Sequence, residues 1–445
     1  MEDTIAAIST ALGVGAISII RVSGNEAIEI VNKIFDHDLL NVESHTIHYG
    51  HIIENNEIID EVLVSVMRSP RTFTYEDTVE INTHGGIATT NKVLELLILN
   101  GARMAEPGEF TKRAFLNGRI DLVEAEGIMN LIEAKSDVSR KLALKQVNGV
   151  VSNNIRNLRE KIMKLIANIA VNIDYPEYED ILEVTTKEVE EEIIYIESKL
   201  NAILSQSNNT SLVLEGLKTV ILGRPNVGKS SILNMLLNEE KAIVTDIAGT
   251  TRDIVEGTLN LNGVYLKLLD TAGVHEASDK VEEIGINKSL NLIKEADLIL
   301  LVLDNNSELT DEDKKLLDLT KDKNRIIIVN KIDLDKKLDL EEENVIYISA
   351  LNKTGLENLR KKIVEMFNLD SINTDMNMFV NANDIAKIKK CLNIIKKIKE
   401  NIKNIEIDMI DIDLREINDI LGSIIGESYD EEILDTVFKN FCLGK

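Results

Sequence analysis

The chain has 445 residues, a length that predicts two to four domains with enough apolar content for real cores. Apolar residues make up 44% and charged residues 28%, which excludes the collagen-like, disordered and disulfide-scaffold classes. The formal net charge of -26 repels polyanions and so disfavours non-specific binding of nucleic acid by the whole surface. Any contact with nucleic acid is therefore expected to be local.

The cysteine content and the amino terminus indicate a cytoplasmic protein. Two cysteines, Cys391 and Cys442, provide no disulfide framework and suit a reducing compartment. Residues 1–10 lack the basic segment, apolar run and cleavage site of a signal peptide. Apolar runs such as 298–303 are far shorter than the ~20 residues needed to cross a bilayer. We therefore expect no membrane association.

The first segment, residues 1–118, predicts an α+β domain. Short β-like runs at 16–22, 60–66 and 78–82 are mixed with helical stretches such as 89–99.

An α/β segment lies between two helical ones. In residues 119–213 and again in 371–445, apolar side chains recur at helical spacing. Residues 214–370 alternate apolar strands with helical patterns, as a βαβ sheet does. Domain termini often lie close together, so we expect 214–370 to be inserted into one helical domain. The predicted fold class is thus multidomain, with an α+β N-terminal domain, an all-α helical domain in two parts and an inserted α/β domain.

The inserted segment contains a phosphate-binding motif. Residues 223–230, Gly-Arg-Pro-Asn-Val-Gly-Lys-Ser, match the P-loop pattern, between the strand-like 217–222 and the helical 231–237. Its glycines let backbone N–H groups wrap phosphates, Lys229 reaches the outer phosphates and Ser230 ligates Mg²⁺. A chance glycine-rich turn before a helix is the alternative, and the downstream motifs argue against it.

Three further elements follow in the order expected of a Ras-like GTPase domain. Residues 245–253 supply a threonine for Mg²⁺ and the γ-phosphate, and 270–273, Asp-Thr-Ala-Gly, supply a metal-shell carboxylate and a glycine N–H. In 330–333, Asn-Lys-Ile-Asp, the carboxylate can accept both N–H donors of a guanine edge, which adenine cannot offer. Ser349 and Ala350 would complete the base pocket. The predicted GTP contacts are Asn226, Val227, Gly228, Lys229, Ser230, Ser231, Thr245, Asp246, Ile247, Ala248, Gly249, Thr250, Thr251, Asp270, Thr271, Ala272, Gly273, Asn330, Lys331, Asp333, Ser349 and Ala350.

The residue that orients the attacking water does not follow from these motifs. A Gln directly after Asp-x-x-Gly does this in Ras-like enzymes, but Val274 stands there. An apolar side chain cannot hold water, so a nearby carboxylate must act instead. Glu276, Glu282 and Glu283 are the candidates, and a solvated acidic helix face is the alternative for each.

Together these motifs resemble the tRNA-modification GTPase family MnmE, also called TrmE. The nucleotide motifs alone also fit other translation-associated GTPases. The discriminating stretches are 106–118, Glu-Pro-Gly-Glu-Phe-Thr-Lys-Arg-Ala-Phe-Leu-Asn-Gly, and the terminal 441–445, Phe-Cys-Leu-Gly-Lys. Residues 13–24 and 84–86 also match, so the likeness covers essentially the whole chain.

The resemblance implies a homodimer formed through the N-terminal domain, which would bind a formyl- or methylene-tetrahydrofolate. Carried over by position, the folate contacts are Arg21, Glu80, Arg119 and Lys445. Arg119 departs from the lysine expected there. The charge is kept, but the planar fork of arginine differs from the point charge of lysine.

In the GTPase domain the resemblance implies a K⁺ site, whose cation would neutralise developing charge as an arginine finger does. The water-orienting carboxylate of the family falls on Glu282, so Glu282, Lys229 and Thr251 form the predicted catalytic set, with Ser230 and Thr251 on Mg²⁺. The implied K⁺ ligands are Asn226, Thr245, Ile247 and Thr250.

The implied reaction adds a carboxymethylaminomethyl-type group at C5 of the wobble uridine of certain tRNAs, in a heterotetramer with a flavin-dependent partner, MnmG or GidA. GTP hydrolysis would drive domain rearrangement rather than the carbon chemistry. Cys442 invites a nucleophile hypothesis if Lys445 makes its setting electropositive. A lone cysteine is more often a small packed residue, so this role stays open.

Two other functions are alternatives to this reaction. One is a ribosome-assembly or RNA-binding regulatory GTPase, which would usually have a basic appendage, whereas residues 1–118 hold 8 basic and 17 acidic side chains. The other is a folate-dependent one-carbon transferase with a regulatory G domain, which differs in whether product formation requires GTP turnover.

Two helical runs are locally basic. Residues 140–164 hold seven basic side chains and one acid, and residues 384–404 hold seven lysines and two acids. They could form a tRNA-facing surface. Ordinary solvated helix faces explain them equally well.

Overall fold

The computed structural model describes most of the chain, and its residues form two compact units. The first unit consists of Met1–Met129, Gln146–Val171 and Asp411–Lys445, and the second of Asn130–Lys145 and Asn172–Ile410. The predicted segment boundaries stay predictions. No helix among the described residues is long and apolar enough to cross a membrane. The described residues are 3–174, 179–214, 216–238, 255–261, 264–269, 292–367, 382–401, 407–428, 431–439, 441 and 444.

The first unit contains a six-stranded sheet in the order β3-β4-β5-β2-β1-β6. All neighbouring strands are antiparallel except β1 and β6, which are parallel. The strands are β1 (Ile5–Ile8), β2 (Ile17–Ser23), β3 (Thr46–Glu54), β4 (Glu57–Met67), β5 (Thr78–His84) and β6 (Arg103–Met104).

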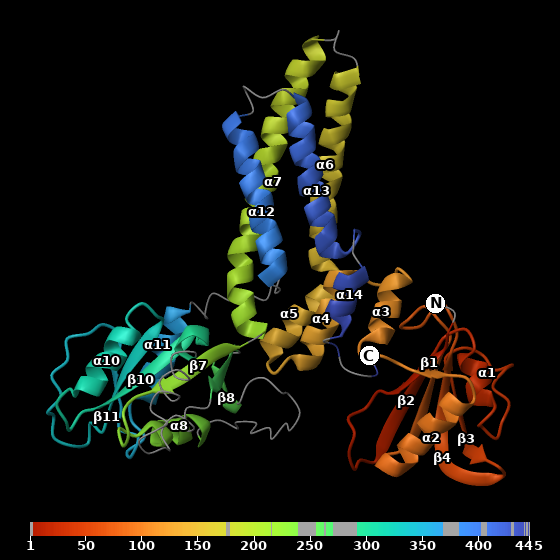
Figure 1. The fold of residues 1–445 in the computed structure, drawn as a ribbon, viewed down its shortest axis with the longest axis horizontal. Helices are drawn as coiled ribbons and strands as arrows, with labels where there is room; N and C mark the ends of the chain where they lie inside the picture. The colour runs from red at the N-terminus through yellow and green to blue at the C-terminus, as the bar shows by residue number, and fades with distance from the viewer. Residues whose placement is uncertain are drawn as a thin grey trace. The chain divides into compact units, whose positions relative to one another are not determined.

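The two faces of this sheet differ. Helices α1 (Ala27–Asn32) and α2 (Ile87–Leu99) share an apolar core with its inner face, and Figure 1 shows α2 lying across the strands. Helix α3 (Glu109–Leu116) covers β1 on the outer face, where Phe110 packs against Ile5. The rest of the outer face, over β2 to β5, is polar or exposed, as the alternating burial pattern of these strands requires.

Among the remaining helices outside the GTPase domain, α6 follows the predicted apolar spacing. Its buried face consists of Ile155, Leu158, Ile162, Leu165, Ile166 and Ile169. The basic run 140–164 is not one helix, because Gly149, with φ +71°, separates α5 from α6. These helices are α4 (Leu122–Glu133), α5 (Asp137–Val147), α6 (Val150–Asp174), α7 (Glu179–Leu214), α12 (Ala382–Asn401), α13 (Ile407–Ile425) and α14 (Glu431–Phe438).

The second unit contains a sheet in the order β12-β11-β10-β7-β9-β8, parallel throughout except for the pair β8 and β9. Its central strands β10 and β11 are continuous buried apolar runs, as expected of a sheet covered on both faces. The strands are β7 (Leu217–Leu222), β8 (Val255–Leu261), β9 (Val264–Leu269), β10 (Leu298–Asp304), β11 (Arg325–Asn330) and β12 (Val345–Tyr347).

Helices cover both faces of this sheet. On one face, α8 (Lys229–Asn238) and α11 (Leu356–Met366) share a core with the strands, and Leu142 of α5 joins it. On the other face, α10 (Asp311–Leu319) contributes Leu317. The carboxyl ends of the parallel strands thus meet at one edge, which is where ligands bind in open α/β sheets.

Candidate functional site

The loop between β7 and α8 has a backbone that only glycine permits at two positions. Gly223 has φ +149°, and a Cβ there would lie 2.4 Å from the carbonyl oxygen of Val302. Gly228 has φ +101°, and a Cβ there would lie 2.2 Å from Nδ2 of Asn330. The loop therefore packs closely against β10 and Asn330 at these two positions, where a side chain would clash.

Lys229 begins α8 and lies across this loop. Its Nζ donates to the carbonyl oxygens of Gly223, at 2.6 Å, and Arg224, at 3.0 Å. Burial lowers the pKa of Lys229, and the charge of Glu312 opposes that effect. Ser230 lies exposed in the first turn of α8. A lysine, a hydroxyl and a helix N-terminus at one point suit the phosphates of a nucleotide.

Asn330 joins the P-loop to the second half of the predicted base pocket. It is 2% exposed at the end of β11. Its Nδ2 donates to the carbonyl oxygen of Val227 at 2.9 Å, and its Oδ1 accepts from the N–H of Ala350 at 3.1 Å. The side-chain amide thus positions two loops that are 123 residues apart in the sequence, which the motif alone did not reveal.

Lys331 and Asp333 continue this arrangement. Lys331 has φ +66°, and its Nζ donates to the carbonyl oxygen of Asn226 at 2.8 Å and contacts Oδ2 of Asp304 at 2.6 Å. The hydroxyl of Ser349 donates to the carboxylate of Asp333, which is exposed. A carboxylate oriented in this way can face the N–H donors of a guanine.

Several predicted site residues lie outside the described part of the chain, so their roles stay predictions. They include most of the predicted Mg²⁺ and K⁺ ligands and the water-orienting carboxylate. These residues are Thr245, Asp246, Ile247, Ala248, Gly249, Thr250, Thr251, Asp270, Thr271, Ala272, Gly273, Glu282, Cys442 and Lys445.

A second candidate site lies on the outer face of the N-terminal sheet. Arg21 on β2 is directly opposite Glu80 on β5. Nε of Arg21 donates to Oε1 of Glu80 at 2.9 Å, and Nη2 lies 2.8 Å from the same oxygen. Nη1 of Arg21 reaches the carbonyl oxygen of Gly444 at 3.5 Å, and Ser9 Oγ donates to that oxygen at 3.1 Å. Gly444 therefore lies beside the ion pair.

Two phenylalanines extend this site, and the sequence analysis missed them. The guanidinium of Arg21 lies 5.7 Å from the ring centroid of Phe110, and that of Arg119 lies 4.9 Å from the ring centroid of Phe73. Phe110 and Phe73 belong to one apolar cluster. The structure thus connects three of the predicted folate contacts. Arg21 pairs directly with Glu80, and the cluster of Phe110 and Phe73 lies between Arg21 and Arg119.

Two charged residues of the stretch 106–118, Glu109 and Arg113, belong to an ion-pair network within the N-terminal domain. Glu109 contacts Nη2 of Arg103 at 2.5 Å and Nη2 of Arg113 at 3.0 Å, and Arg113 is 1% exposed. Burial raises the pKa of Glu109, but hydrogen bonds from Arg103, the N–H of Glu106 and Arg113 outweigh it, so the pKa lies below its usual value. The carboxylate is therefore held ionised at neutral pH.

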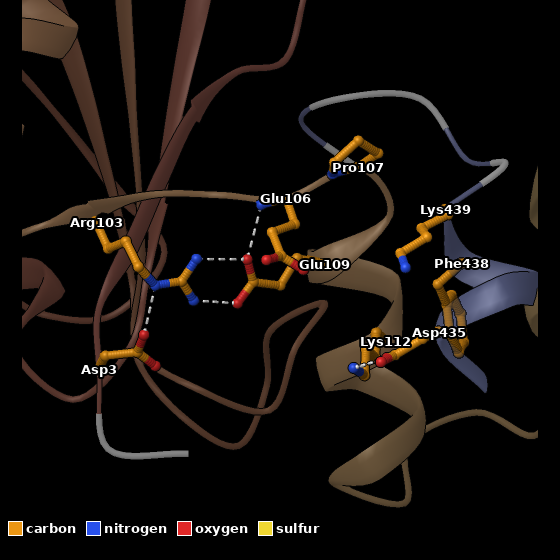
Figure 2. Close-up of a pocket in the computed structure, with 9 residues that line it drawn as sticks. All are labelled: Asp3, Arg103, Glu106, Pro107, Glu109, Lys112, Asp435, Phe438 and Lys439. Carbon is orange, nitrogen blue, oxygen red and sulfur yellow. Dashed lines mark hydrogen bonds and ion pairs between the residues drawn. The ribbon is translucent and has the colours of Figure 1, made fainter. Parts of the chain in front are cut away.

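A polar pocket of about 290 Å³ adjoins this network (Figure 2). On its far side Lys112 of α3 contacts Asp435 of α14 at 2.5 Å. Gly108, with φ +70°, fits closely against α14, because a Cβ there would lie 2.4 Å from the carbonyl oxygen of Phe438. Contacts with α3 thus attach α14 to the N-terminal domain. The pocket is lined by Asp3, Arg103, Glu106, Pro107, Glu109, Lys112, Asp435, Phe438 and Lys439.

Comparison with known proteins identifies the family. The model of the GTP-binding protein TrmE N-terminus matches residues 4–119, and that of the MnmE helical domain matches residues 122–442. The tRNA modification GTPase MnmE of Streptococcus thermophilus (strain CNRZ 1066) is 50% identical over 449 residues, which span 100% of this chain and 98% of that protein. The chain belongs to the MnmE family of tRNA modification GTPases. The MnmE of Ligilactobacillus salivarius (strain UCC118) is also 50% identical, over 455 residues, with the same two coverages.

Family membership confirms the resemblance inferred from the sequence and the predicted fold class. The chain is a GTPase with a TrmE N-terminal domain, an MnmE helical domain and a P-loop GTPase domain. Among solved structures, the G domain of the T. maritima FeoB iron transporter is 28% identical, spanning 34% of this chain and 98% of that chain with a TM-score of 0.25. Family membership therefore depends on the family models and the MnmE relatives, and not on this structural match.

Proposed function

We propose that this GTPase acts with a flavin-dependent partner protein, of the kind called MnmG or GidA, to add a carboxymethylaminomethyl-type group at C5 of the wobble uridine of certain tRNAs. The main support is the 50% identity over the full chain to proteins named tRNA modification GTPases. The protein acts in the cytosol, where these tRNAs are. GTP turnover drives rearrangement of the domains, and the one-carbon unit comes from folate.

GTP and Mg²⁺ fit the residues at the end of β7. The glycine-permitted loop and the first turn of α8 present N–H groups, and Lys229 supplies a positive charge for the outer phosphates. Ser230 and Thr251 hold Mg²⁺, which neutralises charge on the phosphates when it is bound. Asp333 accepts from the guanine edge, and Glu282 orients the attacking water.

We propose a K⁺ ion beside the phosphates, with Asn226, Thr245, Ile247 and Thr250 as ligands. Supporting this, Asn226 is exposed, with φ +65°, and Lys331 anchors its carbonyl oxygen. Hydrolysis is then much faster in KCl than in NaCl at equal ionic strength. Equal rates in the two salts would remove the K⁺ site from the proposal.

A reduced folate fits the Arg21–Glu80 pair. Arg21 contacts Glu80 through Oε1, and Arg119 and Lys445 add positive charge for a carboxylate tail. A carboxylate such as Glu80 can accept from the adjacent N–H donors of a pterin ring. The folate supplies the one-carbon unit when it is bound, and these side chains bind and orient it.

The outer face of the N-terminal sheet supports the proposed homodimer. The strand register places exposed apolar side chains on the same face as Arg21, across β2, β3 and β4. An exposed apolar face of this kind is typical of a protein interface. The flavin-dependent partner would complete a heterotetramer. The exposed side chains are Ile17, Ile47, Tyr49 and Leu63, with exposed fractions of 62%, 66%, 60% and 44%.

Nucleoside mass spectrometry of tRNA from cells lacking this protein tests the proposed function. We expect loss of the wobble-uridine modification, restored by the wild-type chain and not by Lys229→Ala. Restoration by Lys229→Ala would favour a one-carbon transferase with a regulatory G domain. An unchanged nucleoside profile, together with altered ribosomal particles, would contradict the proposal in favour of a ribosome-assembly GTPase.

A further inference from the structure

The two basic runs of the sequence differ in what their side chains do. On α5, Arg140 and Lys141 both contact Asp137, at 2.7 and 2.8 Å. On α6, Arg156 contacts Asp121 at 2.7 Å, and Arg159 pairs with Glu427. Four of the seven basic side chains in this run therefore contact acids within the protein, which weakens their attraction for a polyanion.

The lysines of α12 are arranged differently. Helix α12 packs against α7, and Figure 1 shows the two helices side by side and antiparallel. The buried side chains of α12 lie on one face and include Ile388, Ile395 and Ile398. The lysines on the opposite face are exposed. They are Lys389, Lys390, Lys396 and Lys397.

Spacing and charge make these four lysines one surface, the α12 lysine face. Lys389 and Lys396 are seven residues, or two helical turns, apart and thus about 10 Å apart along the axis. Glu400 is the acid on the same face, and it lies 3.9 Å from Lys396, which is 73% exposed. Lys390 and Lys397 add charge beside them, although both also make contacts within the protein. The face therefore has a net charge of +3 with Glu400 included.

The neighbouring helix does not offset this charge. Lys399, at the side of α12, contacts Glu197 of α7 at 2.5 Å and holds the two helices together. From there toward its end at Leu214, α7 has no acidic residue, and this is the part that runs beside the rest of α12. The acids Glu190 to Glu192 lie in the other direction along α7. The positive face is therefore not neutralised from α7.

We propose that the α12 lysine face binds the phosphate backbone of tRNA. This inference rests on the proposed function, because it assigns a contact surface to that substrate. Lysines act as point charges on phosphates and read no base, and this face has no aromatic side chain to stack on one. The contact is therefore sequence-independent. It gives an acidic chain a local site for a polyanion despite the net charge of -26.

The test is tRNA affinity of the full-length chain as a function of salt. The double variant Lys389→Glu/Lys396→Glu should bind tRNA at least ~10-fold more weakly at low salt, since it reverses two phosphate contacts. In Lys389→Ala/Lys396→Ala, the slope of the logarithm of the tRNA binding constant against the logarithm of salt concentration should fall in magnitude by about 2 at most, because each lost phosphate contact lowers it by about 1. Arg140→Glu/Lys141→Glu is the matched control, because it changes the net charge equally where the charges are already paired. It should change affinity less than ~2-fold.

The outcomes separate this inference from the proposed function. GTPase rate and melting temperature report whether each variant folds, and both should match the wild type. If the wild type binds tRNA and the α12 variants bind it equally well, or lose no more affinity than the control, the lysine face is not the contact. If the variants keep tRNA affinity and lose affinity for the flavin-dependent protein, the face binds an acidic protein surface instead. Absence of tRNA binding by the wild type, alone and with that protein, would overturn the proposed function together with this surface.

Discussion

The GTP site and the Arg21–Glu80 site are built in opposite ways. The P-loop is a single contiguous run, and its partners Asn330 and Ala350 lie at the ends of neighbouring parallel strands. The N-terminal site brings together Arg21, Glu80 and Gly444 through strand register and the docking of the chain's end. A contiguous motif can be recognised from the sequence, whereas a site made by register cannot.

The charges of the two sites differ as well. Lys229 is held by backbone carbonyl oxygens and forms no ion pair with a carboxylate in the described part of the chain, so its positive charge is available to phosphate. Arg21 is already paired with Glu80, and their side chains are 20% and 25% exposed. Removing Lys229 therefore removes binding charge alone, while removing Arg21 also leaves a half-buried carboxylate without its partner.

The largest effect expected is that of Lys229→Ala on nucleotide binding. GTP affinity should fall by at least ~100-fold, because a charge-assisted contact to the phosphates is lost. Titration with a fluorescent GTP analogue measures it, and the stabilisation by reduced folate should be unchanged. Lys314→Ala is the control, since Lys314 is an exposed lysine of the same domain, 4.0 Å from Asp311. A loss of folate binding in Lys229→Ala would show that the two sites are not built independently.

The next effect is on turnover rather than binding. Glu282→Ala should lower kcat for GTP hydrolysis by about 10- to 100-fold with nearly unchanged GTP affinity, because water orientation matters mainly in the transition state. Single-turnover and steady-state rates in KCl measure it. Glu283→Ala, at the adjacent position, should hydrolyse GTP normally. Unchanged turnover in Glu282→Ala would refute the assignment made through the family resemblance.

A substitution in the N-terminal site should weaken folate binding and leave GTP binding unchanged. Arg21→Ala should abolish most of the rise in melting temperature that a reduced folate produces, with about tenfold weaker binding, and GTP affinity should stay the same. Arg21→Lys keeps the charge without the planar fork, so it should retain part of the shift. An identical folate shift in the wild type and in Arg21→Ala contradicts the proposed contact.

The smallest effect concerns pH and the N-terminal domain alone. Nδ1 of His84 lies 2.6 Å from the buried carboxylate of Asp60. The hydrogen bond between them is the main cause that raises the pKa of His84, and the negative charge of Asp60 is the second. Because the pKa of His84 is higher in the folded state, its protonation stabilises the folded protein fully at pH values below the unfolded pKa of about 6.5. This stabilisation is lost as the pH rises through the pKa of the folded state. The melting temperature of the wild type relative to His84→Gln should therefore decline slightly from pH 6 to 8. A constant difference would mean that the pair does not titrate in this range.

Several elements could be predicted from the sequence because their patterns are local. Strand β7 and helix α8 lie at nearly the positions that the sequence predicts, since an apolar run and a glycine-rich turn delimit them. Strands β1 and β3 were not expected. β1 has only four residues, buried on both faces, and β3 is an edge strand whose polar side chains alternate weakly with apolar ones. Neither gives a clear period-2 signal.

The site residues also include some that a local sequence pattern predicts and others that only the fold brings together. The motif predicts that Asn330 contacts GTP. The structure adds that its amide holds the P-loop and the Ala350 loop together, a role that depends on strands brought side by side. Phe73 and Phe110 lie beneath Arg119 and Arg21, and a phenylalanine in a sequence gives no sign of which cation it will contact.

That the protein is a P-loop GTPase follows from the sequence alone, because a motif of glycines, lysine and serine between a strand and a helix has few other backbone conformations. Which charges are available to a ligand depends instead on the folded structure. On α5 and α6, acids that lie close by in the fold, some of them far away in the sequence, contact Arg140, Lys141, Arg156 and Arg159. The α12 lysine face points away from the packed side of its helix. Whether a charge is neutralised depends on its neighbours in space, and composition does not contain that information.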